Sequence, residues 1–217
     1  MRGGTLETES SETVNQARNV TEEPSPAPLH DFLQLQRDNP DCIGWVSIPG
    51  TDIDFPVMQS TDVPEFYLKH DFNGNYTDYG LPFLDERCSL ATSDNLIIYG
   101  HHMNDGSMFS ELLQYEDKSY FEQHPEIILE TVLGVKCYKV AAVIQAAGSY
   151  EPDTWSIFNC IDLDTGSFER MKQELADRQF YETGIDIAMG DRLLTLATCE
   201  YSQYNGRLAV VAIKSKR

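Results

Sequence analysis

Eight short runs of β-prone residues, separated by turn-forming residues, constrain the fold of this 217-residue chain more than any other feature. The runs are rich in branched and aromatic side chains, which strands favour. The first two flank Pro49-Gly50-Thr51-Asp52, a composition typical of a hairpin turn. Eight such strands predict a mainly β fold, a closed or nearly closed barrel. The expected strands are residues 45–48, 53–58, 81–84, 95–99, 127–131, 135–146, 193–198 and 208–213.

Helices are expected to interrupt these strands in four places. A short first helix is expected to end at Asp38-Asn39-Pro40, with Leu29, Phe32, Leu33 and Gln36 on one face. Two more are expected at residues 107–115 and 118–123. The longest, residues 165–181, lies between two strands without regular alternation, which disfavours a parallel βαβ architecture. Its expected apolar side consists of Phe168, Met171, Leu175 and Phe180.

The composition predicts one folded domain behind a flexible segment. Residues 1–28 are rich in Glu, Ser, Thr and Pro and poor in large apolar side chains, so we expect a flexible, disordered tether. Residues 29–217 are expected to form the folded domain. No run of about 18 apolar residues occurs, so any membrane anchor is expected outside this chain. The net charge of −19 argues against binding nucleic acid or an anionic membrane surface.

The cysteines indicate catalysis more than metal binding. There is no C-x-x-C pair and no D-x-D-x-D-G loop, so neither a metal nor a cofactor is expected. Cys137 lies in an apolar run and is expected in the core. Cys199 ends the run TLATC, where a strand end exposes a thiol to chemistry. The five cysteines are Cys42, Cys88, Cys137, Cys160 and Cys199.

A cysteine nucleophile needs a base or ion-pair partner and a donor for the oxyanion that its attack creates. His101 also follows a predicted strand, and Arg207 opens the strand after Cys199. Taken singly, a loop histidine or a surface arginine commonly has only a structural role. The three together predict a cysteine-based active site, with His102 as the nearest alternative to His101.

The motif TLATC followed by Arg207, with YGHHMNDGSMF upstream, resembles the sortases, and class B sortases in particular. The stretches GWVSIPGTDIDFPV, FYLKHDF and GLPFLD are also similar to that family, so the resemblance covers about residues 29–217. Papain-like proteases and caspases fit poorly, because their cysteine and histidine occur in other arrangements. The resemblance implies an eight-stranded sortase barrel with an N-terminal helix and a long helix before the last two strands. It also implies that Cys199 is the nucleophile, His101 the general acid and base, and Arg207 the donor to the substrate or oxyanion.

Further positions match the family's substrate groove. Tyr99 and Thr198 fall where class B sortases line that groove, although packing in the barrel explains them equally well. Leu68 and Tyr150 align with the groove more loosely. Ala197 departs from the family pattern, in which a serine often precedes the Thr-Cys pair, so a groove hydrogen bond from this position is expected to be absent.

The resemblance implies a transpeptidase that cleaves a sorting signal after its threonine and joins the acyl part to an amine. Signals like NPQTN or LPxTG, and an acceptor amine from a peptidoglycan precursor or a pilin lysine, are the implied partners. The implied location is the outer face of the plasma membrane of a Gram-positive bacterium. Two alternatives remain open, a cysteine peptidase or hydrolase of the same fold and a non-catalytic β-barrel module.

Overall fold

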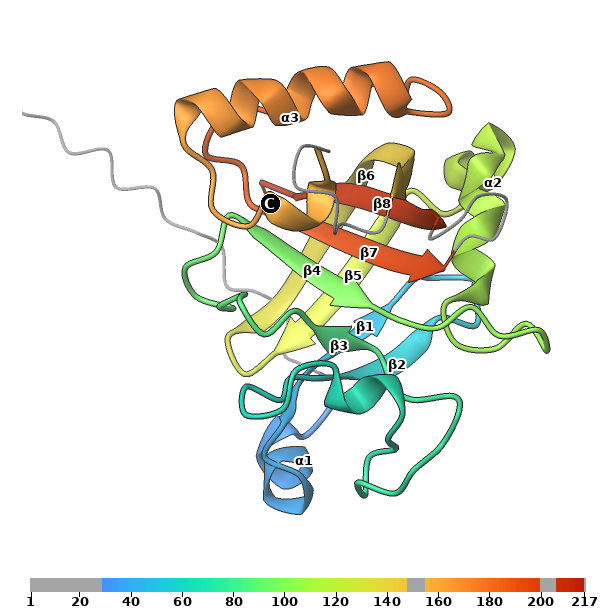
Figure 1. Ribbon diagram of the computed structural model, residues 1–217, viewed down its shortest axis with the longest axis vertical. Coiled ribbons are helices and arrows are strands. Elements are labelled where there is room, and N and C mark those ends of the chain that lie inside the picture. Colours follow the sequence, from blue (N-terminus) through green and yellow to red (C-terminus); the bar gives the residue numbers. More distant parts are fainter. Residues whose placement is uncertain (1–28, 148–154, 200–205, 217) are drawn as a thin grey trace, which may run out of the picture.

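The computed structural model describes residues 29–147, 155–199 and 206–216, and all eight expected strands are present (Figure 1). Their ends differ from the expected ones by up to three residues, most at the start of β1, and β3 is only two residues long. The expected tether, residues 1–28, lies outside the described residues. The strands are β1 (Cys42–Ser47), β2 (Asp54–Met58), β3 (Phe83–Leu84), β4 (Asn95–Tyr99), β5 (Glu126–Thr131), β6 (Gly134–Ala147), β7 (Leu193–Cys199) and β8 (Gly206–Lys214).

The strands close into a barrel in the order β1-β2-β3-β4-β7-β8-β6-β5. Most neighbours are antiparallel, and the hairpin expected between β1 and β2 is confirmed. Two pairs are parallel, β2 with β3 and β4 with β7. Because β4 and β7 are parallel neighbours, their carboxyl ends meet at the same end of the barrel. This pairing brings the residues that follow β4 and β7 close together in space.

Three α-helices and three 3-10 turns surround the barrel: α1 (Phe32–Asp38), η1 (Phe66–Leu68), η2 (Ser110–Glu116), α2 (Lys118–Gln123), η3 (Ile157–Asn159) and α3 (Thr165–Arg178). The helix expected at residues 107–115 is the 3-10 turn η2. Figure 1 shows α3 across one side of the barrel, over β6 and β8, with α1 at the opposite end. Aspartates cap all three α-helices, since Asp31, Asp117 and Asp164 each accept a hydrogen bond from a first-turn backbone N–H. No helix among the described residues has the length and hydropathy of a membrane span.

Several expected core positions were wrong. Phe180 lies beyond the end of α3 and is 43% exposed, whereas Phe168, Met171 and Leu175 of that helix are buried. The seven-residue α1 fully buries only Phe32 and leaves Leu29 and Leu33 exposed, because the face that it turns to the barrel carries Phe32 and the partly buried Leu35. Cys137 is only partly buried, since it alternates along β6 with Tyr138, which faces the core.

Branched aliphatic side chains fill the barrel interior, including Ile97, Leu129, Val143 and Leu196, which are fully or almost fully buried. On the other face of β5, the charged Glu130 is also buried, at 3% exposed. Its carboxylate accepts the Leu29 backbone N–H at 2.7 Å and lies 3.3 Å from the His30 ring, so it holds the start of the described chain to the barrel wall.

Candidate active site

Strand pairing brings the ends of β4 and β7 together. The last parallel pair is Tyr99 with Ala197, and the Gly100 N–H continues the ladder by donating to the Ala197 carbonyl at 3.0 Å. His101 follows Tyr99 by two residues, and Cys199 follows Ala197 by two. Neighbouring strands are about 4.8 Å apart. His101 and Cys199 therefore leave the same end of the barrel on adjacent strands.

The antiparallel pairing of β7 with β8 adds the third predicted residue. Cys199 is the Cα partner of Arg207 in this pair. Figure 1 shows β4, β7 and β8 side by side. The backbone thus brings Cys199 between His101 on one side and Arg207 on the other. The side chain of Cys199 lies outside the described part of the structure.

The His101 ring has a defined orientation. Its Nε2 lies 2.7 Å from the backbone carbonyl of Leu68. Because a carbonyl oxygen can only accept, Nε2 carries the hydrogen of this bond. The other ring nitrogen, Nδ1, is the atom left to give or take a proton. Behind the ring, the Phe109 N–H donates to the His101 carbonyl at 2.8 Å and holds the backbone of the loop after β4.

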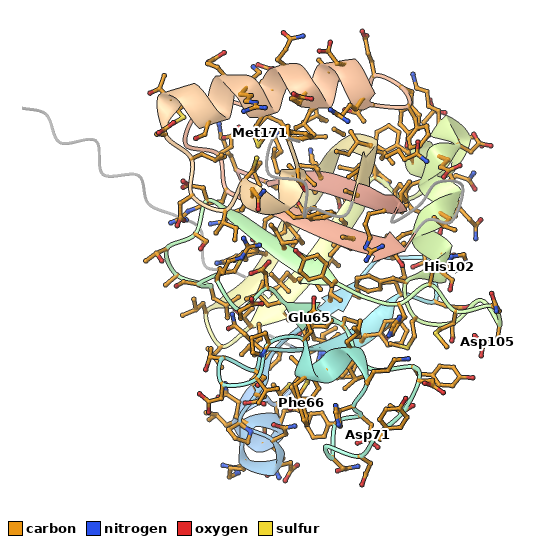
Figure 2. All side chains as sticks on the ribbon, in the orientation of Figure 1. Glu65, Phe66, Asp71, His102, Asp105 and Met171 are labelled. Atoms are coloured by element: carbon orange, nitrogen blue, oxygen red, sulfur yellow. The ribbon has the colours of Figure 1, made fainter. Side chains whose placement is uncertain are left out.

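The carbonyl that orients His101 comes from η1 and is held by close backbone packing. Figure 2 labels Glu65 and Phe66 at the start of this turn. Gly80 has φ of +57°, and a Cβ at this position would lie 2.5 Å from the Leu68 carbonyl oxygen. Only glycine permits this approach. Leu68 was predicted as a groove residue, and its carbonyl contact with His101 could not be foreseen from residue type.

A groove of about 480 Å³ opens at this end of the barrel, within the usual size range of ligand sites. Of the three predicted catalytic residues, His101 and Arg207 have described side chains, and both line this groove. The predicted groove residues Leu68, Tyr99 and Thr198 also line it, whereas Tyr150 lies outside the described residues. His102 is not among the described residues that line the groove, so His101 is the better placed of the two histidines.

Thr198 lines the groove and carries a hydroxyl that is buried in the structure. The residue is 2% exposed, and among the described residues its hydroxyl has no hydrogen-bond partner. A buried hydroxyl without a partner costs about 1–3 kcal/mol, which a bound peptide can offset. Ala197, beside it, supplies no side-chain hydrogen bond, as expected from its departure from the family pattern.

None of the four cysteines whose side chains are described, Cys42, Cys88, Cys137 and Cys160, lines the groove, and Cys42, Cys88 and Cys160 are free thiols. Burial raises the pKa of the Cys88 thiol to about 12 and that of the Cys160 thiol to about 11. Neither is a thiolate at neutral pH, so neither can act as a nucleophile there. The described residues contain no group of three or more His, Cys, Asp or Glu side chains arranged to hold a metal ion.

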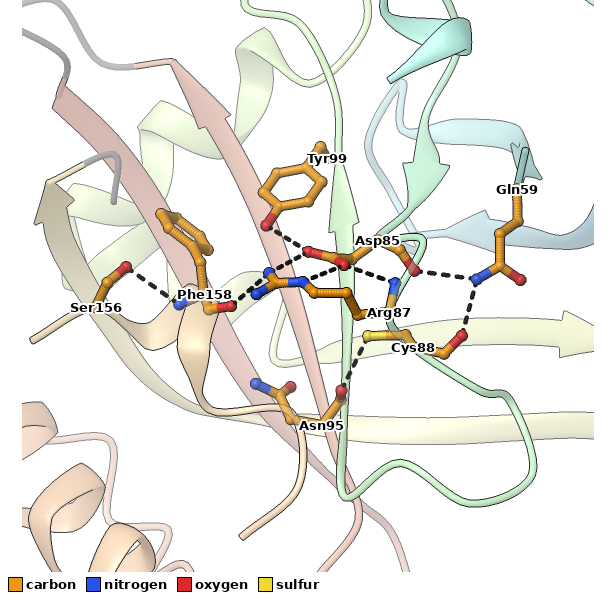
Figure 3. A network of polar contacts seen from close by, with 8 residues as sticks. All are labelled: Gln59, Asp85, Arg87, Cys88, Asn95, Tyr99, Ser156 and Phe158. Carbon is orange, nitrogen blue, oxygen red and sulfur yellow. Dashed lines mark hydrogen bonds and ion pairs between the residues drawn. The ribbon is translucent and has the colours of Figure 1, made fainter. Parts of the chain in front are cut away.

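A polar network beside the catalytic end was not predicted (Figure 3). Asp85 is 3% exposed and accepts hydrogen bonds from the Arg87 guanidinium and from the Tyr99 hydroxyl. Burial would raise the pKa of the Asp85 carboxyl, but the N–H donors and charge of Arg87 outweigh it and hold that pKa below its usual range. Burial, together with the Asp85 charge, raises the pKa of Tyr99, so its phenol stays protonated and donates. Asp85 ends the GLPFLD stretch, so the motif pointed to the position but not to its role.

Comparison with known proteins identifies the family. The sortase domain model matches residues 46–215. Sortase B of Listeria monocytogenes is 34% identical over 186 residues, covering 83% of this chain and 72% of the relative. Sortase B of Staphylococcus aureus is 30% identical over 185 residues, covering 83% and 73%.

Solved structures show the same similarity. The structure of Clostridium perfringens sortase B aligns with a TM-score of 0.74 and 29% identity, covering 86% of this chain and 100% of that one. A Staphylococcus aureus sortase B–substrate complex aligns with a TM-score of 0.76 and 28% identity, covering 85% and 84%. The chain therefore belongs to the sortase family of cysteine transpeptidases, which act in the Gram-positive cell envelope, and within that family to the class B sortases.

Proposed function

We propose that this enzyme cleaves a C-terminal sorting signal after its threonine and transfers the acyl part to an amine, with Cys199 as nucleophile. One observation carries the assignment of residues: Cys199 pairs with Arg207 across β7 and β8, and Cys199 and His101 each lie two residues beyond the last β4–β7 pair, Tyr99 with Ala197. The motif resemblance supports the same three residues.

The first half-reaction forms a thioester. The Cys199 thiolate attacks the carbonyl carbon of the signal's threonine, and the carbonyl electron pair moves to oxygen. Arg207 donates hydrogen bonds to this oxyanion or to the adjacent substrate backbone, for which its planar fork is suited. Collapse of the intermediate breaks the peptide bond, and the protonated His101 gives a proton to the leaving amine.

The second half-reaction transfers the acyl group. An incoming amine attacks the thioester, neutral His101 accepts a proton from that amine, and the Cys199 thiolate leaves. The imidazole nitrogen that exchanges these protons is Nδ1, because Nε2 donates to the Leu68 carbonyl. Each cycle restores the thiolate and the protonated imidazole.

The groove supplies the binding contacts in this proposal. The Thr198 hydroxyl, which has no partner among the described residues, hydrogen-bonds the peptide, while Tyr99 and Leu68 form apolar contacts. Tyr150, which lies outside the described residues, is proposed as a further binding residue from the family resemblance alone. We propose a signal like NPQTN or LPxTG and an acceptor amine from a peptidoglycan precursor or a pilin lysine. Sortase B structures in complex with a substrate and with Gly3 support these two kinds of partner. The site of action would be the outer face of the plasma membrane, with residues 1–28 as tether.

The test is product analysis by mass spectrometry. The wild type, Cys199→Ala and the control Cys137→Ala are incubated with NPQTN, LPxTG and related peptides, with and without a glycine or lysine amine. We expect an acyl adduct that passes to the amine in the wild type and in the control, and no adduct in Cys199→Ala. Cleavage that gives only the hydrolysed peptide, even when the amine is present, would favour a hydrolase. No adduct with any peptide would favour a non-catalytic barrel and contradict the proposal.

A further inference from the structure

We propose that Asp85 and Arg87 are a positioning pair that fixes one wall of the substrate groove and thereby determines which sorting signal the enzyme accepts. The inference rests on the proposed function, which it refines. Neither residue is assigned a part in the chemistry, and both act through the elements that they hold.

The pair is built as a rigid fork (Figure 3). The Arg87 Nε donates to Asp85 Oδ1 at 2.9 Å, and Nη2 donates to Oδ2 at 2.7 Å. The Arg87 backbone N–H also donates to Oδ1, at 3.0 Å. Two parallel charge-assisted hydrogen bonds define the relative geometry of the two side chains far better than a single contact does. The fork therefore fixes the loop between β3 and β4.

Two further hydrogen bonds connect the ion pair to other parts of the groove wall. The Tyr99 hydroxyl of β4 donates to Asp85 Oδ2 at 3.0 Å. The Arg87 Nη2 donates to the backbone carbonyl of Phe158, in η3, at 2.9 Å. The rings of Tyr99 and Phe158 are themselves in contact, with centroids 5.6 Å apart. One ion pair thus connects β4, the β3–β4 loop and η3, all of which line the groove.

The position of η3 at the groove depends on this connection. Phe158 and Asn159 line the groove, and Asn159 is exposed there. Because Arg87 holds the Phe158 carbonyl, movement of the guanidinium moves the wall that these two residues form. The catalytic residues are positioned differently, by the backbone ladder of β4, β7 and β8. A change in the pair should therefore alter peptide binding more than the chemical step.

The exposure of Arg87 indicates that the pair positions the groove wall more than it stabilises the fold. The Asp85 side chain is 4% exposed, but that of Arg87 is 49% exposed and lies on the groove. Solvent around Arg87 screens the pair, so its net contribution to stability is modest. What the fork supplies is a defined geometry at the surface that a peptide contacts.

Kinetics of Arg87→Lys and Asp85→Asn test the inference with the peptide that the wild type cleaves best and with single-residue variants of it. Lysine keeps the charge but cannot contact both carboxylate oxygens and the Phe158 carbonyl. We expect KM to rise about tenfold, kcat to change less than about threefold, and the order of preference among peptides to change. The matched control is Arg192→Lys, since Arg192 also donates to loop carbonyls, those of Thr92 and Ser93, but at the other end of the barrel.

Chemical rescue adds a second measurement, the KM of an alanine variant with and without guanidinium. A residue with only a structural role should show no rescue of KM. In Arg87→Ala, millimolar guanidinium should occupy the space beside Asp85 and lower KM towards the wild-type value. The same salt should leave KM of Arg192→Ala unchanged. Thermal unfolding of each variant shows that the protein compared is folded.

The results separate the two proposals. If Arg87→Lys keeps the wild-type KM and peptide preference, and differs only in thermal stability as the Arg192 control does, the pair is structural and the inference is wrong. If the wild type itself forms no adduct, the proposed function falls, and the inference falls with it. An active wild type with unaltered Arg87 and Asp85 variants overturns the inference alone.

Discussion

Gly100, which joins β4 to His101, gives the sharpest test of how the barrel positions the catalytic end. A Cβ at this position would lie 2.5 Å from Cδ2 and 2.6 Å from Cγ of Phe109. Carbon atoms in contact are normally about 3.5–4.0 Å apart, so the Phe109 ring must move by about 1 Å in Gly100→Ala. Phe109 is fully buried and has no empty space to enter without disturbing its neighbours.

Overpacking of this kind costs about 1–3 kcal/mol of unfolding free energy. For a chain of this size, each kcal/mol lowers Tm by about 2–4 °C, so Gly100→Ala should melt about 2–12 °C below the wild type. Activity should fall as well, because the Phe109 N–H holds the His101 carbonyl and its displacement moves the catalytic loop. A misplacement of about 1 Å can cost up to about 100-fold in rate.

Thermal unfolding and peptide cleavage by the same protein samples provide the assay. Gly166→Ala is the matched control, since its Cβ would meet only Asp164 Oδ1, at an ordinary 3.6 Å. Phe109→Leu should partly relieve Gly100→Ala, so the double variant should lose less stability than the two single losses added together. Wild-type Tm and wild-type cleavage in Gly100→Ala would refute the reasoning, because the contact with Phe109 would then impose no constraint.

Three further outcomes follow from the site. Arg207→Lys should lower kcat/KM by about 10²–10³, since lysine lacks the planar fork, and near-wild-type kinetics would contradict that role. Thr198→Val should fold at least as stably as the wild type, because the lost hydroxyl has no partner among the described residues, yet its KM for the peptide should rise several-fold; an unchanged KM would remove Thr198 from binding. Because the pKa of Asp85 is lowered in the folded state, its contribution to stability is present above the ordinary aspartate pKa of about 3.9 and is lost as the pH falls through the lowered value. Denaturant unfolding of wild type and Asp85→Asn should therefore show a gap at pH 6 that narrows below about pH 4, and a gap that stays constant would contradict the assignment.

The expected strands were confirmed, whereas the faces of the helices were predicted less well. Alternation of buried and partly exposed residues along a strand such as β1 is a local property, so it can be recognised without knowing the partner strand. The buried face of a helix depends on what it packs against. Leu33 and Phe180 were expected on buried faces, but α1 meets the barrel through Phe32 and Leu35, and α3 ends before Phe180.

In the candidate site, too, some features could be predicted from the sequence and others could not. The motif around Cys199 and the positions of His101 and Arg207 could be predicted because spacing along the chain and family resemblance both pointed to them. The carbonyl that orients His101 and the contact of Arg87 with Phe158 could not, since every residue has a carbonyl and nothing in residue type selects one.

The sequence by itself determined the eight strands, the positions of most helices and the three residues proposed for catalysis, because these depend on local pattern and motif. Only the tertiary structure decided that β4 and β7 pair in parallel, that Leu68 holds the His101 ring, and that the Asp85–Arg87 ion pair connects three walls of the groove. Leu68 and His101 are 33 residues apart, and Arg87 and Phe158 are 71 apart. Contacts over such separations depend on barrel closure and strand register, which arise from the packing of the whole chain.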